Sequence, residues 1–344
     1  MRHSLKITIA GAGIFGLWQA ITLARAGHHV RVLERCQVPF AEAASQYAGA
    51  MIAPYCEAET AEPIVRDLGL HAAKLWKQIY PDLIEAGSLV VAGARDQGEL
   101  RRYARMTIGH GKVDAARIAE LEPDLADRFT TGLFFVDEAH MATPKALLDL
   151  LDLARSAGAQ FRFGVEWDGR PGGGEGDCDI VIDCRGIAAR DDVADLRGVR
   201  GERLVIETQE IALSRPVRLL HPRFSCYIVP WGDGRFLVGA TVIESDDDRA
   251  VTVRSALELL GLAYALHPAF GEAEVVEMTA GVRPSFADNV PRVRVGGGAS
   301  STIIRVNGAF RHGFLLAPVM AEVVAGYLGA ENFEHPLLER GMTD

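Results

Sequence analysis

The chain has 344 residues, of which 49% are hydrophobic and 24% charged, the balance of an ordinary globular protein that divides into two domains. Its 46 acidic residues outnumber the 36 basic ones, and a net charge of −10 without a Lys/Arg block argues against nucleic acid as a partner. No uncharged apolar run reaches about 18 residues, so we expect no membrane-spanning helix.

The cysteines are five in number and lie at scattered spacings, without a C-x-x-C pair or a Cys/His grouping: Cys36, Cys56, Cys178, Cys184 and Cys226. Such a set favours neither a disulfide framework nor a zinc site, so we expect no bound metal and a reduced, cytoplasmic compartment. Gly11 and Gly13 interrupt the apolar N-terminus, which indicates a first strand rather than a signal peptide.

The first strong motif is a strand followed by a glycine-rich turn and a helix. Residues 7–10 predict a short apolar strand, GAGIFG follows, and the apolar run Ile14–Ala26 predicts a helix. Gly11 permits a tight turn, Gly13 lets backbone approach a pyrophosphate, and Gly16 lets helix and strand pack closely. This order predicts a dinucleotide-binding fold with the pyrophosphate at the helix N-terminus.

A second strand follows at His29–Leu33 and finishes at Glu34, about 20 residues after the first glycine. The Glu34 carboxylate can accept hydrogen bonds from both ribose hydroxyls and would repel a 2′-phosphate. The motif alone does not separate FAD from NAD.

Segments further along the chain favour FAD. The small-residue loop Ala43–Glu59 (AASQYAGAMIAPYCEAE) can approach a flat ring system. The alternative interpretation is a surface loop with a helix start. Asp179–Gly186 predicts an apolar strand with an acidic end and a glycine turn, which any α/β sheet can contain. Asn307–Pro318 joins a strand at Ile303–Val306 to an apolar helix at Leu315–Leu328, and so directs a second helix N-terminus into the protein.

The other elements alternate between helices and strands and then become hairpin-like. Helices are predicted at Ala61–Tyr80 and Pro144–Ala157, and strands at Ser88–Ala92, Leu133–Val136, Ile180–Asp183, Arg203–Glu207, Cys226–Val229 and Arg235–Ala240. Tyr227–Val242 predicts one hairpin around the turn Asp233-Gly234. We therefore predict an α/β fold in which a Rossmann-like FAD-binding domain is interleaved with an antiparallel-sheet (α+β) substrate domain.

Several motifs in chain order resemble the D-amino-acid oxidase superfamily of flavoproteins, most closely its glycine oxidases of thiamine biosynthesis: GAGIFG with Glu34, AGAMIAPYCEAE, LEPDL, DCRGIAA, YIVP with GAT, GVRP, and FRHGFLLAP. They span residues 7–318. The resemblance implies an FAD-binding domain of residues 1–75, 140–198 and 287–344, with a substrate domain of residues 76–139 and 199–286. Ala309 and His312 depart from the His and Asn that relatives often carry, which leaves contacts at the flavin edge open.

The resemblance also implies noncovalent FAD, since covalent relatives use a cysteine in the C-terminal part and none follows Cys226. The cofactor contacts that it implies are Gly11, Gly13, Ile14, Phe15, Gly16, Glu34, Arg35, Ser45, Gly49, Ala50, Met51, Val165, Cys184, Gly186, Arg283, Arg311, His312, Gly313, Phe314 and Leu315. Two of these have an alternative interpretation: Met51 as a core residue and His312 as a solvated or capping residue.

Three residues are candidates for orienting a substrate. Arg283 in GVRP can hold a carboxylate with a planar guanidinium, at a strand end that we expect Pro284 to terminate; the alternative is a surface salt bridge. Tyr227 can donate its hydroxyl to the same carboxylate, or it can be a packed strand tyrosine. Arg311 can assist substrate binding, or it can anchor the flavin edge or a neighbouring carboxylate.

The function implied by the resemblance is an FAD-dependent oxidase that converts glycine to its imine while O2 is reduced to H2O2. The imine then hydrolyses to glyoxylate and ammonia or feeds thiazole assembly. Two alternatives remain open. One is a sarcosine, D-amino-acid or secondary-amine oxidase or dehydrogenase of the same fold, and the other is a flavin-holding subunit of a hetero-oligomeric complex. The expected partners are a small amine and O2, with neither nucleic acid nor membrane, and the chain can form a homo-oligomer.

Overall fold

The computed structural model describes residues 4–168, 178–297 and 302–342, which form two compact units. Unit 1 contains the described residues of segments 1–48, 144–199 and 283–344, and unit 2 contains residues 49–143 and 200–282. Each unit is therefore built from separate stretches of the chain, as an interleaved architecture requires. Residues 49–75 and 140–143, expected in the FAD-binding domain, lie in unit 2, and residues 283–286, expected in the substrate domain, lie in unit 1.

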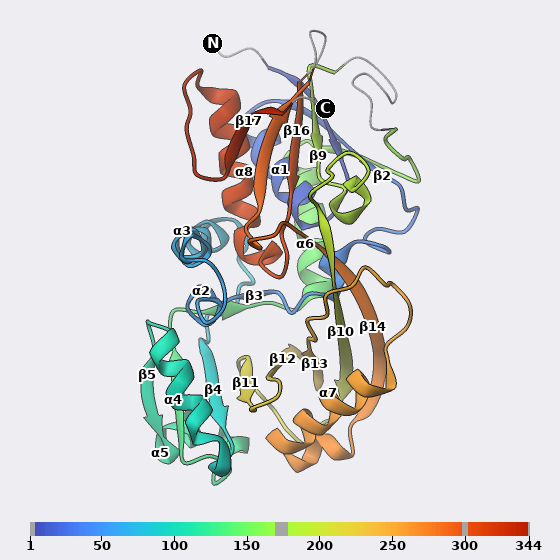
Figure 1. The fold of residues 1–344 in the computed structure, drawn as a ribbon. Coiled ribbons are helices and arrows are strands. Elements are labelled where there is room, and N and C mark those ends of the chain that lie inside the picture. The colour runs from blue at the N-terminus through green and yellow to red at the C-terminus, as the bar shows by residue number, and fades with distance from the viewer. Residues whose placement is uncertain (1–3, 169–177, 298–301, 343–344) are drawn as a thin grey trace. The chain divides into compact units, whose positions relative to one another are not determined.

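Unit 1 is built on a seven-stranded sheet with the order β17-β15-β16-β9-β1-β2-β8 (Figure 1). The strands are β1 (Lys6–Ala10), β2 (His29–Glu34), β8 (Gln160–Phe163), β9 (Ile180–Asp183), β15 (Arg292–Gly296), β16 (Thr302–Asn307) and β17 (Leu338–Met342). The central strands β16, β9, β1, β2 and β8 are all parallel, and β15 runs antiparallel to β16. The predicted Rossmann-like sheet is confirmed.

The helices of unit 1 are α1 (Ile14–Arg25), α6 (Thr143–Ser156) and α8 (Gly313–Gly329). Both α1 and α8 are apolar on nearly every face because they pack against each other as well as on the sheet. The buried Gln19 side chain donates from Nε2 to the carbonyl of Met320 at 3.1 Å, which fixes one helix against the other. The predicted helices that follow the two glycine turns are thus confirmed to within two residues.

Unit 2 is built on an eight-stranded sheet with the order β14-β10-β13-β12-β11-β4-β6-β5. The strands are β4 (Ser88–Ala92), β5 (Gly111–Asp114), β6 (Thr131–Phe135), β10 (Arg197–Glu207), β11 (Val217–Leu220), β12 (Cys226–Gly232), β13 (Arg235–Gly239) and β14 (Glu274–Ser285). A separate ribbon pairs β3 (Met51–Ile52) with β7 (Ala139–His140). Most pairs are antiparallel, as predicted, but β4 and β11 are parallel.

The predicted hairpin is confirmed, since β12 and β13 pair antiparallel around Asp233 and Gly234. Both turn residues have positive φ, at 52° and 74°, which is the conformation that Asp-Gly accommodates in a two-residue turn. The expectation that Pro284 ends its strand was wrong, because β14 continues to Ser285. Proline is tolerated here because β14 is the last strand in the sheet order and its outer edge needs no N–H donor.

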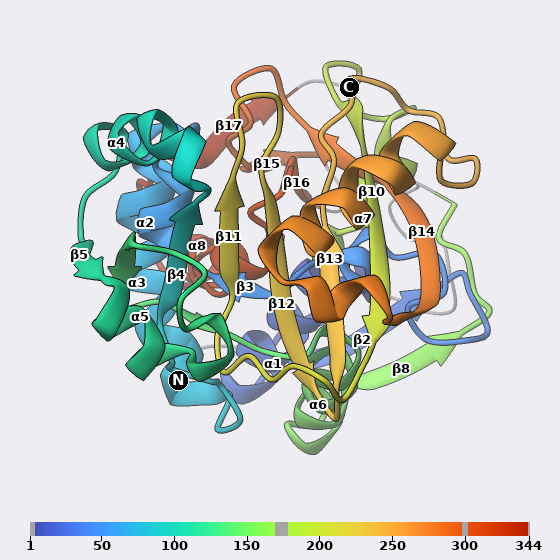
Figure 2. The ribbon, with the colours of Figure 1, turned by 90° about the horizontal axis from the view of Figure 1, so that it is seen from below.

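The two faces of the unit 2 sheet carry different helices. On one face α7 (Val253–Leu266) lies across β12 and β13 (Figure 2). Its residues Leu259 and Leu262 belong to the same buried core cluster as Ile228 and Phe236. On the other face α4 (Gln97–Met106) buries Leu100 against β4 and β6. The remaining helices are α2 (Pro54–Glu57), α3 (Pro63–Ile79) and α5 (Ala115–Leu121), with 3-10 turns at Ala44–Tyr47, Ala94–Asp96, Pro123–Leu125, Gly186–Ala189 and Pro268–Gly271.

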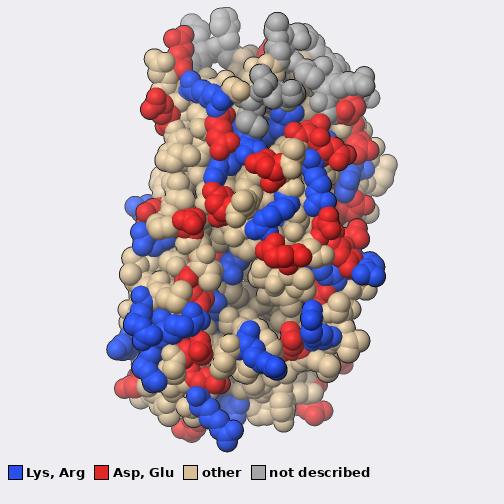
Figure 3. All heavy atoms as spheres, in the orientation of Figure 1, with Lys and Arg blue, Asp and Glu red and all other residues tan. Residues whose placement is uncertain are grey.

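Charged side chains of both signs are interspersed over the face shown in Figure 3. Exposed pairs such as Arg35–Glu42 and Arg117–Glu120 are screened by water, so each contributes little to stability. None of the five cysteines forms a disulfide. Across residues 4–168, 178–297 and 302–342, no helix has the length and hydropathy needed to cross a membrane.

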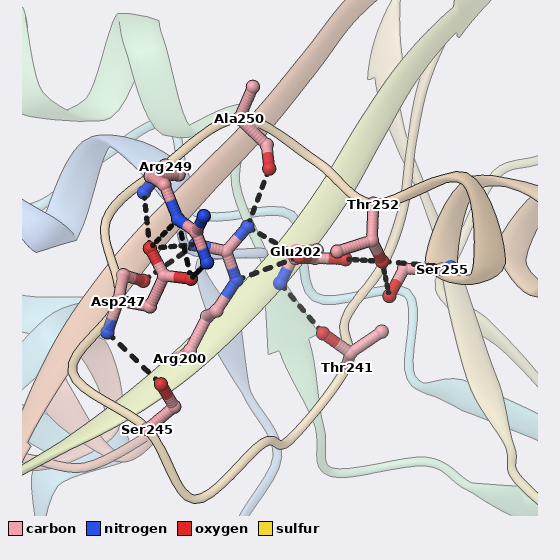
Figure 4. Close-up of polar contacts among 9 residues, drawn as sticks. All are labelled: Arg200, Glu202, Thr241, Ser245, Asp247, Arg249, Ala250, Thr252 and Ser255. Carbon is pink, nitrogen blue, oxygen red and sulfur yellow. Dashed lines mark hydrogen bonds and ion pairs between the residues drawn. The ribbon is translucent and has the colours of Figure 1, made fainter.

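A buried arginine ties the loop before α7 to strand β10 (Figure 4). Arg200, which is 3% exposed, donates from Nε to Glu202 at 2.7 Å and from its terminal nitrogens to the carbonyls of Asp247 and Ala250. Glu202 is also buried and accepts a hydrogen bond from Thr252. Burial opposes ionisation of Glu202, but bonds from Ser255 and Arg200 outweigh it and lower its pKa.

We predict that Arg200→Met destabilises the protein by about 3 kcal/mol or more, because the buried Glu202 carboxylate loses its cation. The measurement is chemical denaturation at neutral pH. The matched control is Arg249→Met, which removes an exposed arginine from the same loop and should leave the midpoint unchanged. Equal midpoints for the two variants would contradict this account of Arg200.

Candidate functional site

The carboxyl ends of the parallel strands β1, β2, β9 and β16 meet at one edge of the unit 1 sheet. In register, Ala10 lies beside Leu33 and Asp183, and Asp183 beside Arg305. Ligands of open α/β sheets bind outside this edge. The predicted glycine turn and Cys184 follow directly on these strand ends, and Glu34 is the last residue of β2.

The glycine turn is set by two close backbone approaches. Gly11 has φ of 95°, and a Cβ there would lie 2.7 Å from the carbonyl oxygen of Cys184. A Cβ on Gly16 would lie only 1.9 Å from the carbonyl oxygen of Gly11, so α1 can pack on the turn only with glycine at this position. Gly13, just before α1, is less crowded: a Cβ there would meet Ser45 Oγ at 3.5 Å.

Glu34 holds the glycine turn against the end of β2. One carboxylate oxygen accepts the N–H of Ala12 at 2.9 Å and the other accepts the N–H of Cys36 at 3.1 Å. Each oxygen retains a lone pair, so the carboxylate can still accept ribose hydroxyls. Ile14 at the start of α1 donates its N–H to Ser45 Oγ at 3.3 Å. The N-terminus of α1, the acidic strand end and the space at Gly13 fit the ADP half of FAD.

A second helix begins next to the first. A Cβ built on Gly313, the first residue of α8, would lie 3.4 Å from the Ile14 side chain, so the N-termini of α1 and α8 adjoin. Phe314 and Leu315 follow in the buried first turn of α8. Two positive helix ends at one place favour a bound anion or a group that becomes anionic.

The loop before α8 is held by its own polar groups. Asn307 donates from Nδ2 to the carbonyl of Gly186 at 2.8 Å, and Phe310 donates its N–H to the carbonyl of Pro284 at 2.8 Å. His312 is buried, with its ring edge-on to Phe310 at 5.5 Å, which disfavours the solvated alternative for this histidine. The guanidinium of Arg311 lies 5.9 Å from the same Phe310 ring.

The other predicted contacts of unit 1 lie around this strand edge. Phe15 is buried in the first turn of α1, and Val165 donates its N–H to the carbonyl of Glu34 at 3.0 Å. Cys184 is buried and donates its N–H to the carbonyl of Ala10, while Arg35 forms an exposed ion pair with Glu42. Their roles toward FAD stay predictions.

In unit 2, four directly opposed strand residues form a row across β11, β12, β13 and β10. The register pairs Arg218 with Tyr227, Tyr227 with Gly239, and Gly239 with Arg203. Opposed residues of antiparallel strands point to the same face, so two arginines flank Tyr227 and the gap left by Gly239. Arg203 is ion-paired with Glu277 of β14 at 3.1 Å.

Tyr227 is half-buried, and its hydroxyl oxygen accepts a hydrogen bond from Arg218 Nη1 at 2.7 Å. The Arg218 side chain also donates to the Tyr103 hydroxyl at 3.2 Å and to the Glu59 carboxylate at 2.5 Å. Arg218 is 6% exposed and Glu59 8%, so this is a buried ion pair. The Tyr227 hydroxyl therefore has a charged partner, which disfavours the alternative of a tyrosine packed only among apolar side chains.

The segment 49–59 lies on the same face as Tyr227. A Cβ on Gly49 would contact Val229 at 3.6 Å and Leu237 at 3.8 Å, and Val229 is two residues along β12 from Tyr227. Ala50 has a positive φ of 47°, and its carbonyl accepts the N–H of Met141. Met51 is partly buried in β3, against a core cluster, which agrees with its core interpretation.

A buried carboxyl supports the start of α2 in this segment. Glu138 Oε1 accepts the N–H of Cys56 at 2.7 Å, and the Cys56 carbonyl accepts the Tyr103 hydroxyl at 3.1 Å. Burial raises the pKa of Glu138 to about 7 and lowers the pKa of His140 to about 4. Burial also raises the pKa of Tyr103 well above its usual value, so this phenol stays neutral.

Arg218, Tyr103 and the role of Glu59 were not predicted from the sequence. One signal was present: Arg218 is the single charged residue in the apolar strand Val217–Leu220, which indicates a buried, paired arginine. Nothing local identifies its partners, because Glu59 and Arg218 are 159 residues apart in the chain.

Comparison with known proteins agrees with this geometry. The family described as FAD dependent oxidoreductase (DAO) matches residues 6–327. A relative from Rhizobium etli, named "Putative thiamine biosynthesis oxidoreductase ThiO", is 49% identical over 328 residues, which cover 95% of this chain and 97% of that protein. The crystal structure of glycine oxidase from Geobacillus kaustophilus superposes with a TM-score of 0.78 at 22% identity, covering 97% of this chain and 96% of that one. Iminodiacetate oxidase from Chelativorans sp. BNC1 superposes with a TM-score of 0.80 at 24% identity, covering 98% and 99%.

The fold and the strand-edge cradle define a dinucleotide-binding oxidoreductase. The chain belongs to the DAO family of FAD-dependent oxidoreductases, because the family match covers most of its length and the Rhizobium etli relative is 49% identical over nearly all of it. FAD rather than NAD is therefore its cofactor, as the sequence predicted.

We predict that Gly13→Ala gives a folded protein with a reduced FAD content. Gly13 has φ of −66°, which alanine adopts, and the added methyl meets only Ser45 and Ala43 at ordinary distances, yet it fills the space at the N-terminus of α1. The measurement is the ratio of visible flavin absorbance to protein absorbance after purification, with circular dichroism to establish folding. The control is Gly261→Ala in α7, where a Cβ meets no atom within 4 Å. A folded Gly13→Ala protein with full FAD would contradict the cradle.

We also predict that Glu138→Gln stabilises the protein more at pH 8 than at pH 5.5. The folded pKa of about 7 lies above the ordinary 4.5, so ionised Glu138 destabilises the fold at high pH, and this penalty disappears as the pH falls toward 4.5. The full effect is on the order of 3 kcal/mol at about 1.4 kcal/mol per pKa unit. Thermal midpoints of both proteins at the two pH values measure it, with exposed Glu120→Gln as control. A pH-independent difference would show that Glu138 ionises normally.

Proposed function

We propose that the chain is an oxidase for glycine or a similarly small amino acid and uses noncovalently bound FAD. The observation that carries the proposal is the polar row on the unit 2 sheet, where the half-buried Tyr227 hydroxyl is held by a buried guanidinium. A phenol fixed in this way suits a small carboxylate, and the name of the Geobacillus kaustophilus relative, "Glycine oxidase", points to the same substrate class.

In this proposal Arg283 grips the substrate carboxylate with two N–H donors, and Tyr227 donates its hydroxyl to the same carboxylate. The substrate ammonium loses a proton, and hydride then leaves Cα. FAD, when bound, would supply the acceptor for this hydride, and O2 would take up the electron pair and two protons to give H2O2. Water adds to the imine product and releases ammonia and glyoxylate. The adjoining N-termini of α1 and α8 stabilise negative charge at the cofactor edge.

One set of test compounds distinguishes the rival substrates. Glycine, sarcosine, D-alanine and a simple amine without a carboxylate are each added anaerobically to the yellow protein, and bleaching of the flavin absorbance is recorded. The proposal predicts the fastest bleaching with glycine and none with the simple amine. Bleaching by sarcosine or D-alanine alone would assign another oxidase of the family, and no bleaching by any compound would favour a flavin-holding subunit. Peroxide formation in air then separates an oxidase from a dehydrogenase.

We predict that Arg283→Lys lowers kcat/KM for glycine by about 10- to 100-fold, because lysine keeps the charge and loses the two-pronged grip on a carboxylate. Steady-state peroxide production measures the effect. Arg235→Lys, at an exposed position of β13, is the control and should retain full activity. Unchanged kcat/KM for Arg283→Lys would remove Arg283 from the site.

A further inference from the structure

We infer that Arg218 is a positioning residue that makes Tyr227 a dedicated hydrogen-bond donor to the substrate carboxylate. The inference rests on the proposed function and deepens it, because it names a group that selects amino acids over plain amines. It concerns a buried arginine that lies one strand away from Tyr227 and acts only through it.

The contacts hold Arg218 between two phenols. Its Nη1 donates to the hydroxyls of Tyr227 and Tyr103, and its Cζ lies 4.8 Å and 4.9 Å from the centres of the two rings. Its Nη2 donates to Glu59 and to Ser225 Oγ. Four hydrogen-bond partners and two rings hold the guanidinium in one orientation. Its hydrogen bond to Tyr227 then fixes the position of the Tyr227 hydroxyl.

Arg218 and its partners Tyr103, Glu59 and Tyr227 differ in how far they are buried, and this decides which of them a ligand can reach. Tyr103 is fully buried, and Arg218 and Glu59 are nearly so, whereas Tyr227 is only half-buried. In this proposal a small carboxylate binds at Tyr227, the partly exposed member, while the Arg218 charge stays compensated by Glu59. Glu59 is itself fixed from outside by Arg102 at 3.0 Å.

The donors and acceptors around Tyr227 determine where its hydroxyl proton points. A guanidinium has no acceptor, so the Tyr227 hydroxyl cannot donate back to Arg218 and must direct its proton elsewhere. The N–H of Arg218 also occupies one lone pair of the phenol oxygen and polarises its O–H bond. The resulting group is a good donor and a poor acceptor. It suits a carboxylate, which only accepts, better than an ammonium, which only donates.

A double-mutant cycle on the FAD-loaded protein tests this. The variants are Arg218→Lys, Tyr227→Phe and the combination, and the readouts are KM and kcat for glycine together with the Kd of acetate from its perturbation of the flavin spectrum. We expect each single variant to raise KM and Kd about tenfold or more, with a smaller change in kcat. The double variant should match Tyr227→Phe within about twofold, because Arg218 acts only through Tyr227.

If Arg218 only stabilises the fold, the double-mutant cycle gives a different result. Arg218→Lys would then weaken the Tyr227→Phe protein by the same factor as the wild type, and such additivity overturns the inference, as does a wild-type KM in Arg218→Lys. Arg235→Lys, at an exposed position of β13, should leave KM for glycine unchanged. If Arg218→Lys does not fold, the paired change Arg218→Gln with Glu59→Gln removes both buried charges and enters the same cycle.

The experiments distinguish failure of the proposed function from failure of the inference about Arg218. If no amino acid bleaches the wild-type flavin and acetate leaves its spectrum unchanged, the proposed function fails and the inference fails with it. If glycine is oxidised but the cycle is additive, the proposed function survives and only the role of Arg218 is rejected.

Discussion

The buried guanidinium of Arg218 is the contact on which the polar face of unit 2 depends. It joins Glu59 and Tyr103, which lie outside the sheet, to Tyr227 in the middle of it. An unpaired buried charge is costly, so segment 49–59 must remain on the sheet whenever Arg218 stays inside. One ion pair thereby fixes a loop and also sets the orientation of the hydroxyl to which we assign substrate binding.

Unit 1 follows a different constraint, the close approach of backbone to backbone. Gly11 and Gly16 bring α1 down onto the ends of β1 and β9, and no larger residue fits at either place. The helix end then offers its N–H groups next to the end of α8, with Glu34 alongside. Because these donors belong to the backbone, the cradle depends on chain geometry.

Much of the fold could be predicted because its signals are local. The glycine spacing before α1 and the Asp233-Gly234 turn each prescribe a conformation within a few residues, and both were confirmed. The parallel pairing of β4 with β11 and the link between Arg218 and Glu59 join residues more than a hundred positions apart, and no periodicity encodes them. The prediction that Pro284 ends its strand was wrong for a related reason. Whether a proline ends a strand depends on whether that strand lies at a sheet edge.

The most direct test of the account is a crystal structure of the FAD-loaded protein with acetate bound. The account predicts the acetate carboxylate within hydrogen-bonding distance of Tyr227 Oη, with Arg218 Nη1 still donating to the same oxygen and Glu59 still paired with Arg218. An acetate ion bound away from Tyr227, or an Arg218 side chain turned from Tyr227 toward the ligand, would contradict it.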